Sequence, residues 1–294
     1  MTPPPQTAAP RTCRVRDIEI GPGRPLAIIA GPCVLESLDL GLEIGRTLRD
    51  ACRDLGLSYI FKASYDKANR SSIDSPRGPG LEQGVSWLAR IGEELGIPTT
   101  TDIHEPHQAA PVAASVDLLQ IPAFLCRQTD LLVAAGRAAA EHGRGVNVKK
   151  GQFVSPGEML GPVEKLAQAG CRNVMLTERG TFFGYNRLVN DFIGVADMMA
   201  LPADGGPPPV CFDCTHSTQR PGAWDGGQKV TAGSRPGMAA MLARAATAAG
   251  VHALFIECHP EPPKALSDAA TMMPLAEVPP LLATLAAIRR AVSA

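Results

Sequence analysis

The sequence predicts a (β/α)₈ barrel formed by a single domain, and three observations support this fold. The chain has 294 residues, somewhat more than the roughly 250 that such barrels typically need. Eight short apolar runs recur along it, and helix-like segments separate most of them, an alternation that favours a parallel sheet. Polar residues follow nearly every run, as they do where barrel strands end at an active site. An open, doubly wound sheet is the alternative.

The predicted strands are the eight apolar runs, and the predicted helices are the longer segments between and after them. In chain order the strands are PLAIIAGP (25–32), YIFKASY (59–65), PTTTDIH (98–104), VDLLQIPA (116–123), GVNVKKGQ (145–152), NVMLTERG (173–180), PPVCFDCTH (208–216) and HALFIECHP (252–260). The helices are expected over 38–55, 81–95, 128–142, 157–169, 187–200, 235–249 and 276–292.

The N-terminal segment MTPPPQTAAPRTC is expected to be a disordered leader over residues 1–13. It is rich in Pro, Thr and Ala, and it lacks the apolar core of a signal peptide. We therefore expect the catalytic barrel to span residues 14–294, with no second domain and with the cytoplasm as the default location.

The composition excludes several classes of protein. Hydrophobic residues make up 45% of the chain and charged residues 19%, and there is no apolar stretch of membrane-spanning length. The net charge of −1 argues against a broad nucleic-acid surface, which needs a basic excess. The eight cysteines are scattered along the chain, so we expect reduced thiols rather than disulfides.

Cationic residues near the strand ends predict a site for an anion. Lys62 and Ser64 are two residues apart on a strand and share a face, and an inward lysine is costly unless it meets an anion or shifts its pKa. Phosphate or carboxylate is the natural ligand. Each cation has the alternative of pairing with a nearby acid such as Asp66 or Glu178, and a lysine that forms a Schiff base is a further alternative. The cationic set is Lys62, Lys67, Arg70, Arg127, Lys149, Lys150 and Arg179.

A second group of residues predicts a metal site. Cys33, His216, Glu257 and Asp268 come from strands 1, 7 and 8 and the loop after strand 8, and these strands become neighbours when a barrel closes. Their mixed sulfur, nitrogen and oxygen donors suit zinc, iron(II) or manganese(II). Taken singly, a cysteine is more often a core residue and a histidine is more often satisfied by hydrogen bonds.

Cys211 and Cys214 form a CxxC pattern, which in other contexts binds zinc or carries out redox chemistry. Within a strand, however, residues three apart point to opposite faces. We expect both to be packing residues. The other polar residues at the ends of the predicted strands are Asp102, His104 and Gln120.

Several longer motifs give the chain a family resemblance that covers almost everything after the leader. They are IAGPCVLES, KASYDKANRSS with SPRGPG, TDIHEP, QIPAFLCRQTDL, NVKKGQFVSP, ERGTFFGYN, FDCTHS and ECHPEPPKALSDA. On these the chain resembles the 3-deoxy-D-manno-octulosonate 8-phosphate synthases, (β/α)₈ enzymes of lipopolysaccharide sugar biosynthesis that join phosphoenolpyruvate to arabinose 5-phosphate. KANRSS is similar to these enzymes, whereas Lys-Pro-Arg-Thr is typical of their relatives that use erythrose 4-phosphate.

The resemblance implies a divalent metal, because the metal-independent branch of the family has asparagine where this chain has Cys33. The implied ligands are Cys33, His216, Glu257 and Asp268. Lys62, Ser64, Lys67 and Gln120 would bind the carboxylate side of phosphoenolpyruvate, and Lys149, Arg179 and the backbone N–H of Ala123 its phosphate. Asn69, Arg70 and Ser71 would bind arabinose 5-phosphate, and Arg127 would reach the sugar phosphate of an adjacent subunit in a homo-oligomer, commonly a tetramer.

The implied reaction brings two phosphates and a carboxylate together, so preorganised cations would be needed to offset their repulsion. Cys33, His216 and Lys149 are the candidate catalytic residues, and either Lys149 or a metal-bound water would give a proton to the new hydroxyl. The segment 217–237 differs from other family members. A Schiff-base aldolase and a non-catalytic anion-binding barrel remain the alternative functions.

Overall fold

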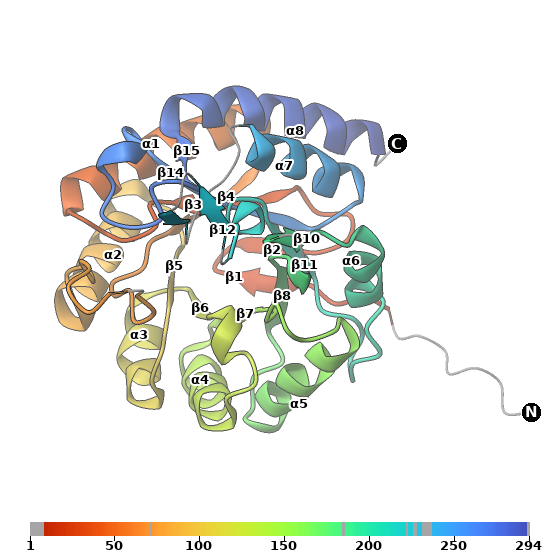
Figure 1. The fold of residues 1–294 in the computed structure, drawn as a ribbon. Coiled ribbons are helices and arrows are strands. Elements are labelled where there is room, and N and C mark those ends of the chain that lie inside the picture. Colours follow the sequence, from red (N-terminus) through yellow and green to blue (C-terminus); the bar gives the residue numbers. More distant parts are fainter. Residues whose placement is uncertain are drawn as a thin grey trace, which may run out of the picture.

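A computed structural model describes residues 9–70, 72–183, 186–221, 223–225, 228–230 and 237–292, and in it eight parallel strands form a closed barrel (Figure 1). Each strand pairs with the next in chain order, and the pairing of the last two with each other and of the last with the first closes the ring. The predicted fold is confirmed. The strands are β3 (Ala27–Gly31), β4 (Ser58–Lys62), β5 (Thr99–Asp102), β6 (Leu118–Ile121), β7 (Gly145–Lys149), β8 (Val174–Glu178), β11 (Val210–Asp213) and β14 (Ala253–His259).

Helices surround the barrel on its outside (Figure 1). Their ends follow local sequence signals: the Ser37 side chain accepts a hydrogen bond from the Leu40 N–H at the start of α1, and Gly56 ends that helix with a φ of 69°, a conformation that glycine adopts at little cost. The helices are α1 (Leu38–Leu55), α2 (Leu81–Leu95), α3 (Ala109–Ser115), α4 (Thr129–His142), α5 (Leu160–Gln168), α6 (Phe192–Met199), α7 (Met238–Ala248) and α8 (Val278–Val292). Of these, α3 was not predicted.

Two apolar cores flank the sheet, one between strands and helices and a smaller one inside the barrel. Alternation along each strand divides its residues between them. Cys211 lies in the inner core and Cys214 in the outer core, so the prediction that these cysteines diverge is confirmed. All eight cysteines are free thiols, as expected.

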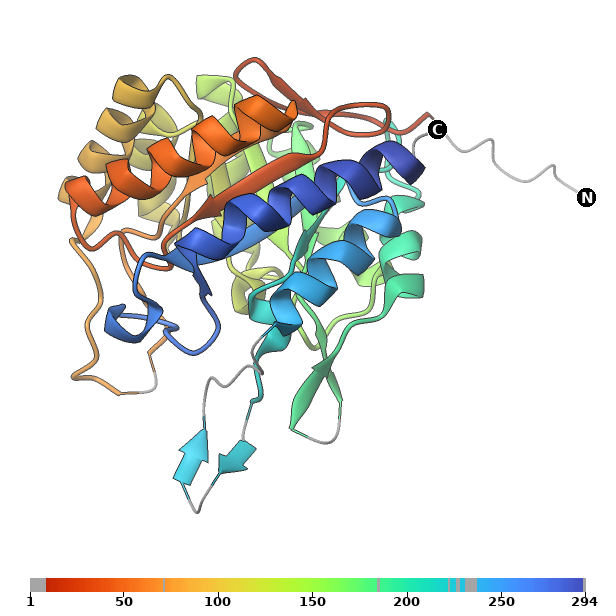
Figure 2. The ribbon, with the colours of Figure 1, turned by 90° about the horizontal axis from the view of Figure 1, so that it is seen from above.

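A short hairpin closes the N-terminal end of the barrel, at the opposite end from the loops that follow the strands (Figure 2). It consists of β1 (Cys13–Val15) and β2 (Ile18–Ile20). The side chains of Cys13, Val15 and Ile20 are buried in the inner core. The predicted end of the leader at residue 13 is therefore wrong, because Cys13 belongs to the folded barrel.

A second hairpin follows β8 and corrects another prediction. Residues 187–200 were expected to be one helix, but β10 (Arg187–Val189) pairs with β9 (Thr181–Phe183), and α6 begins only at Phe192. Asp191 caps that helix by accepting the Ile193 N–H. The remaining strands are β12 (Ala223–Asp225) with β13 (Gln228–Val230), and β15 (Met273–Pro274), which extends β14.

Among the helices that the structure describes, none is both long enough and apolar enough to cross a membrane.

Candidate active site

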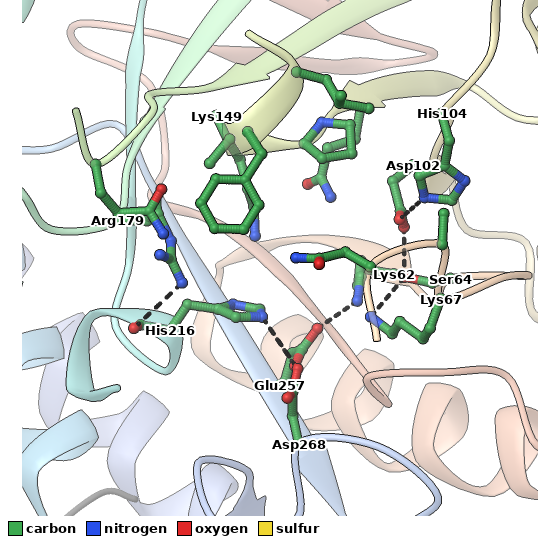
Figure 3. Close-up of a pocket in the computed structure, with 18 of the residues that line it drawn as sticks. Lys62, Ser64, Lys67, Asp102, His104, Lys149, Arg179, His216, Glu257 and Asp268 are labelled. Carbon is green, nitrogen blue, oxygen red and sulfur yellow. Dashed lines mark hydrogen bonds and ion pairs between the residues drawn. The ribbon is translucent and has the colours of Figure 1, made fainter. Parts of the chain in front are cut away.

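A cavity of about 480 Å³ opens where the barrel strands end (Figure 3). Because the strands are parallel and closed into a ring, residues far apart in the sequence meet on its wall. Eleven of the predicted site residues line it: Lys62, Ser64, Lys67, Asn69, Gln120, Ala123, Lys149, Arg179, His216, Glu257 and Asp268.

The four predicted metal ligands lie together at one side of this cavity. Donor atoms of Cys33, Glu257 and Asp268 all lie within 4.8 Å of one another, and the Cys33 Sγ is 3.1 Å from the Asp268 Oδ2. The His216 Nε2 lies 3.4 Å from the Glu257 Oε2 and 3.7 Å from the Asp268 Oδ2. The chain thus brings a thiol and two carboxylates together, and the His216 imidazole lies beside the two carboxylates.

The side chains around this cluster fit a bound cation. The Glu257 Oε2 is buried and has no hydrogen-bond partner among the described residues, although such atoms are nearly always satisfied. The His216 Nδ1 contacts the Asp213 Oδ2 at 2.7 Å, which directs the other ring nitrogen toward Glu257 and Asp268. A carboxylate behind a histidine is the usual support of a metal-binding imidazole. A divalent metal therefore suits this group of residues.

The electrostatics of the cluster agree with this interpretation. Burial raises the pKa of the Cys33 thiol well above its usual value, and the Glu257 carboxylate raises it further. A cation at the cluster would oppose both effects and favour the thiolate. Burial would also raise the pKa of Glu257, but His216 and Lys62 outweigh it and lower that pKa to about 2. Glu257 is therefore an anion.

Buried cations lie beside the Cys33, Glu257 and Asp268 cluster, and each of them contacts an acid or a polar group. The Lys62 Nζ lies 2.5 Å from the Glu257 Oε1 and 3.0 Å from the Cys33 carbonyl oxygen. The Lys149 Nζ lies 2.6 Å from the Asp213 Oδ2 and 3.5 Å from the centre of the Phe255 ring. Burial lowers the pKa of Lys149 despite that carboxylate. Two ammonium groups thus face the same cavity.

Arg179 supplies a third positive charge. It is 4% exposed, and its Nη2 donates to the Gln219 Oε1 at 2.6 Å. Its Nη1 is buried and has no hydrogen-bond partner among the described residues. Burial lowers the pKa of the guanidinium, yet arginine remains charged in proteins. An anion in the cavity would satisfy this unpaired donor.

A third group, on the wall formed by β4 and β5, was only partly anticipated. Ser64 donates a hydrogen bond to the Asp102 Oδ1, and the Lys67 Nζ donates to the Ser64 Oγ at 3.0 Å. The His104 Nε2 lies 2.8 Å from the Asp102 Oδ2. Burial would raise the pKa of Asp102, but His104 and Lys67 lower it well below its usual range. Asp102 and His104 were recognised only as polar strand ends and received no role.

Asp213 was missed altogether by the sequence analysis. It is fully buried and contacts both Lys149 and His216 through its Oδ2. Burial would raise its pKa, but His216 and Lys149 lower it well below the usual range. The available signal was its place at the end of a strand, three residues before a histidine.

Comparison with known proteins gives the family. The profile of the DAHP synthetase I family matches residues 6–293. The chain belongs to the DAHP synthetase I family. Among its curated relatives is the 2-dehydro-3-deoxyphosphooctonate aldolase of Nitratidesulfovibrio vulgaris (strain DP4), which is 54% identical over 261 residues, or 89% of this chain and 91% of the relative.

Two further relatives carry the same name as that aldolase. The protein of Cyanothece sp. (strain PCC 7425) is 51% identical over 277 residues, covering 94% of this chain and 97% of its own. The protein of Desulfotalea psychrophila is 50% identical over 276 residues, covering 94% of each chain. The chain thus aligns with these members of the DAHP synthetase I family over nearly its whole length.

Some predicted site residues of this family member lie away from the cavity wall. The Arg70 Nη1 donates to the Ser267 Oγ at 2.6 Å and its Nη2 to the Leu266 carbonyl oxygen at 3.3 Å. The Arg127 side chain is 67% exposed and lies 3.8 Å from the Glu158 carboxylate. Ser71 lies outside the described residues, as do residues 222, 226–227 and 231–236 of the segment 217–237.

One cation of the predicted anion site, Lys150, pairs with a nearby acid instead. The Lys150 Nζ lies 3.4 Å from the Glu178 Oε2, with both groups buried. Arg77 takes up the Asp66 carboxylate through two hydrogen bonds. Lys150 therefore stabilises the loops after β7 and β8, whereas Lys149 and Arg179 face the cavity.

Proposed function

We propose that the protein condenses phosphoenolpyruvate with D-arabinose 5-phosphate and water to give 3-deoxy-D-manno-octulosonate 8-phosphate and phosphate, a step of lipopolysaccharide sugar biosynthesis in the cytoplasm. The observation that carries this proposal is that His216, Glu257 and Asp268 line one cavity with Lys62, Lys149 and Arg179, and that the Cys33 thiol lies beside the two carboxylates. The names of relatives about half identical in sequence support it.

The proposed binding of phosphoenolpyruvate uses the deepest cations. Lys62, Ser64, Lys67 and Gln120 would hold its carboxylate side. Lys149, Arg179 and the Ala123 N–H would hold its phosphate, for which the unpaired Nη1 of Arg179 is a free donor. These groups are fixed before the ligand arrives, so they stabilise the clustered negative charge without reorganising.

The sugar phosphate would bind nearer the rim of the cavity. Asn69, Arg70 and Ser71 would engage it, and Arg127 would reach the phosphate in an adjacent subunit of a homo-oligomer, commonly a tetramer. The exposure of Arg127 supports a role between subunits. In the reaction, C3 of phosphoenolpyruvate forms a bond to the aldehyde carbon, water adds at C2, and the C–O bond to phosphate breaks.

Cys33, His216, Glu257 and Asp268 would hold a divalent metal, for which zinc, iron(II) and manganese(II) suit the mixed donors. When bound, such an ion supplies Lewis acidity that orients the aldehyde and a water or lowers the pKa of that water. Asp213 holds the His216 ring in place through its Oδ2. Lys149 is our candidate for the group that gives a proton to the former aldehyde oxygen, and its lowered pKa favours this transfer.

The assay that tests the proposal follows phosphate released from phosphoenolpyruvate with arabinose 5-phosphate as the acceptor. Erythrose 4-phosphate in its place is the matched control. Release with arabinose 5-phosphate, at a kcat/KM at least tenfold higher, is the expected result. A preference for erythrose 4-phosphate would assign the seven-carbon synthase activity instead.

A Schiff-base aldolase is the second candidate, because Lys149 is buried and its pKa is lowered. Its ion pair with Asp213 favours the ammonium form over the nucleophilic amine. Borohydride added during turnover would trap a lysine adduct if the Schiff-base route operated, and we expect no such adduct by mass spectrometry.

A further inference from the structure

A second cavity, of about 390 Å³, lies between β10, the turn at His216–Thr218 and the start of α7. It is separate from the candidate active site, and Gln219 lines both cavities. None of the residues given a catalytic or substrate role above lines it. The proposed function therefore does not explain the residues that line the second cavity.

Arg187 and Arg220 both line this second cavity. Neither guanidinium makes an ion pair or a hydrogen bond with any described residue, and the described lining includes no acid. Two like charges beside one cavity repel each other, and the repulsion is relieved when an anion lies between them. Two solvated arginines would also explain this observation, so a second, independent observation is needed.

The second observation is a buried hydroxyl on the cavity wall. Ser217 is 2% exposed, and its Oγ has no hydrogen-bond partner among the described residues. A buried hydroxyl without a partner is costly. A ligand oxygen in the cavity would satisfy this donor.

The start of α7 also favours an anion in the second cavity. Gly237 caps this helix without a side-chain hydrogen bond, so the first backbone N–H groups lack the partner that a serine or aspartate cap would give. Met238, the first residue of the helix, lines the cavity. The N-terminal end of a helix favours anions.

Asn190, Thr218 and Gln219 are the other polar residues of the wall, and an apolar part is formed by Leu188, Met238, Met241 and Leu242. An inorganic anion bound there would make no contact with this apolar surface. We propose that the second cavity binds a phosphate monoester, with its phosphate between Arg187 and Arg220 and its carbon part on the apolar wall. A phosphate monoester carries nearly two negative charges at pH 7, which matches the two guanidinium groups.

Phenyl phosphate is a suitable probe, because it has both a phosphate and an apolar part and cannot act as the acceptor sugar. Calorimetric titration of the full chain is expected to detect two bound molecules, one in each cavity. The double variant Arg187→Gln/Arg220→Gln should bind one, with affinity for the second lowered at least tenfold. Arg46→Gln, an exposed arginine of α1, is the matched control and should bind two.

Three further variants distinguish loss of the second site from a folding defect. Ser217→Ala removes only the hydroxyl and should weaken the second site several-fold, and Arg187→Lys/Arg220→Lys should retain it. Arg179→Gln should remove only the site in the candidate active site. If the Arg187→Gln/Arg220→Gln protein binds as many molecules as the wild type, the proposal is overturned. Loss of a site in that variant together with full binding by Arg179→Gln would support the second cavity and count against our assignment of Arg179.

Discussion

At the scale of single residues, we expect the Cys33 thiol to decide whether the cluster binds a metal. Replacing Cys33 with Ala removes the sulfur that lies 3.1 Å from Asp268. We expect the purified variant to lose most of its metal and at least 100-fold in kcat, measured by elemental analysis and by phosphate release. Cys52→Ala, at a buried cysteine of α1, is the control and should keep both. Full activity of Cys33→Ala in the presence of a chelator would rule out the metal role.

Asp213 acts through two neighbours, and its role can be tested separately from that of the ligands. Asp213→Asn weakens the support of the His216 ring and removes the charge beside Lys149. Loss of a carboxylate behind a metal-binding histidine typically costs roughly 10- to 100-fold in metal affinity or activity, and we expect a loss in that range by metal titration. Asp117→Asn is the control, because Asp117 pairs with Arg144 away from the cavity. Unchanged metal affinity in Asp213→Asn would show that His216 needs no such support.

His252 is expected to make stability depend on pH. Burial, and to a lesser extent the charge of Arg289, lowers its pKa from 6.5 to about 4 in the folded protein. The unfolded chain therefore binds a proton more readily between these values, so stability is full above pH 6.5 and falls as the pH drops to 4. The loss is about 3 kcal/mol in the free energy of unfolding, measurable by urea denaturation.

His252→Asn keeps a side-chain acceptor for the Val210 N–H, which donates to the His252 Nδ1 in the folded protein, but it does not titrate in this range. The pH dependence of its unfolding should be flatter than that of the wild type between pH 4 and 6.5. Equal slopes for the two proteins would mean that other groups cause the effect.

At the scale of elements, glycines that end helices contribute to stability through their backbone conformation. Gly143 ends α4 with a φ of 63°, and a Cβ there would meet no neighbouring atom. Gly143→Ala should therefore lower the free energy of unfolding by about 1 kcal/mol from backbone strain alone. Gly157→Ala is the control, because Gly157 has equal space and no positive φ. A loss at Gly157 as large as at Gly143 would refute this explanation.

The predicted elements were accurate where a long amphipathic pattern or capping residues at the ends define them. Helices α1 and α2 begin and end at the predicted residues, because serine or glycine marks their ends. Helix α3 has only seven residues, too few for a helical period to be evident. The three-residue strands β1 and β2 are also too short to show alternation, and β10 was merged with the helix that follows it.

The candidate site was predictable to a different degree for each kind of residue. Polar residues at strand ends are visible once a barrel is assumed, which identified Lys62, Lys149 and Glu257. The ligand set as a whole came from closure of the barrel and from the family resemblance. Asp213 was not predicted, because its importance lies in the contacts that it makes with Lys149 and His216. Such contacts exist only after folding.

At the scale of the whole molecule, the β1–β2 hairpin is held against the barrel by Asn173 as well as by its buried side chains. The Asn173 Oδ1 accepts the Arg14 N–H at 2.7 Å, and its Nδ2 donates to the Arg14 carbonyl oxygen at 2.7 Å. Asn173→Ala should cost about 1–2 kcal/mol and speed hydrogen exchange at residues 13–20 relative to β7. Gln83→Ala, an exposed residue of α2, is the control. Unchanged exchange would mean that apolar packing alone holds the hairpin.

The same hairpin has a consequence for the order of events during turnover. Because its side chains fill the floor of the barrel, ligands reach the candidate active site through the opposite opening. Lys62 and Lys149 are buried below that opening, whereas Asn69 is exposed near it. Under the proposed function, we therefore expect the molecule bound to the two lysines to enter before its co-substrate, and the released phosphate to leave only after the opening above it is free.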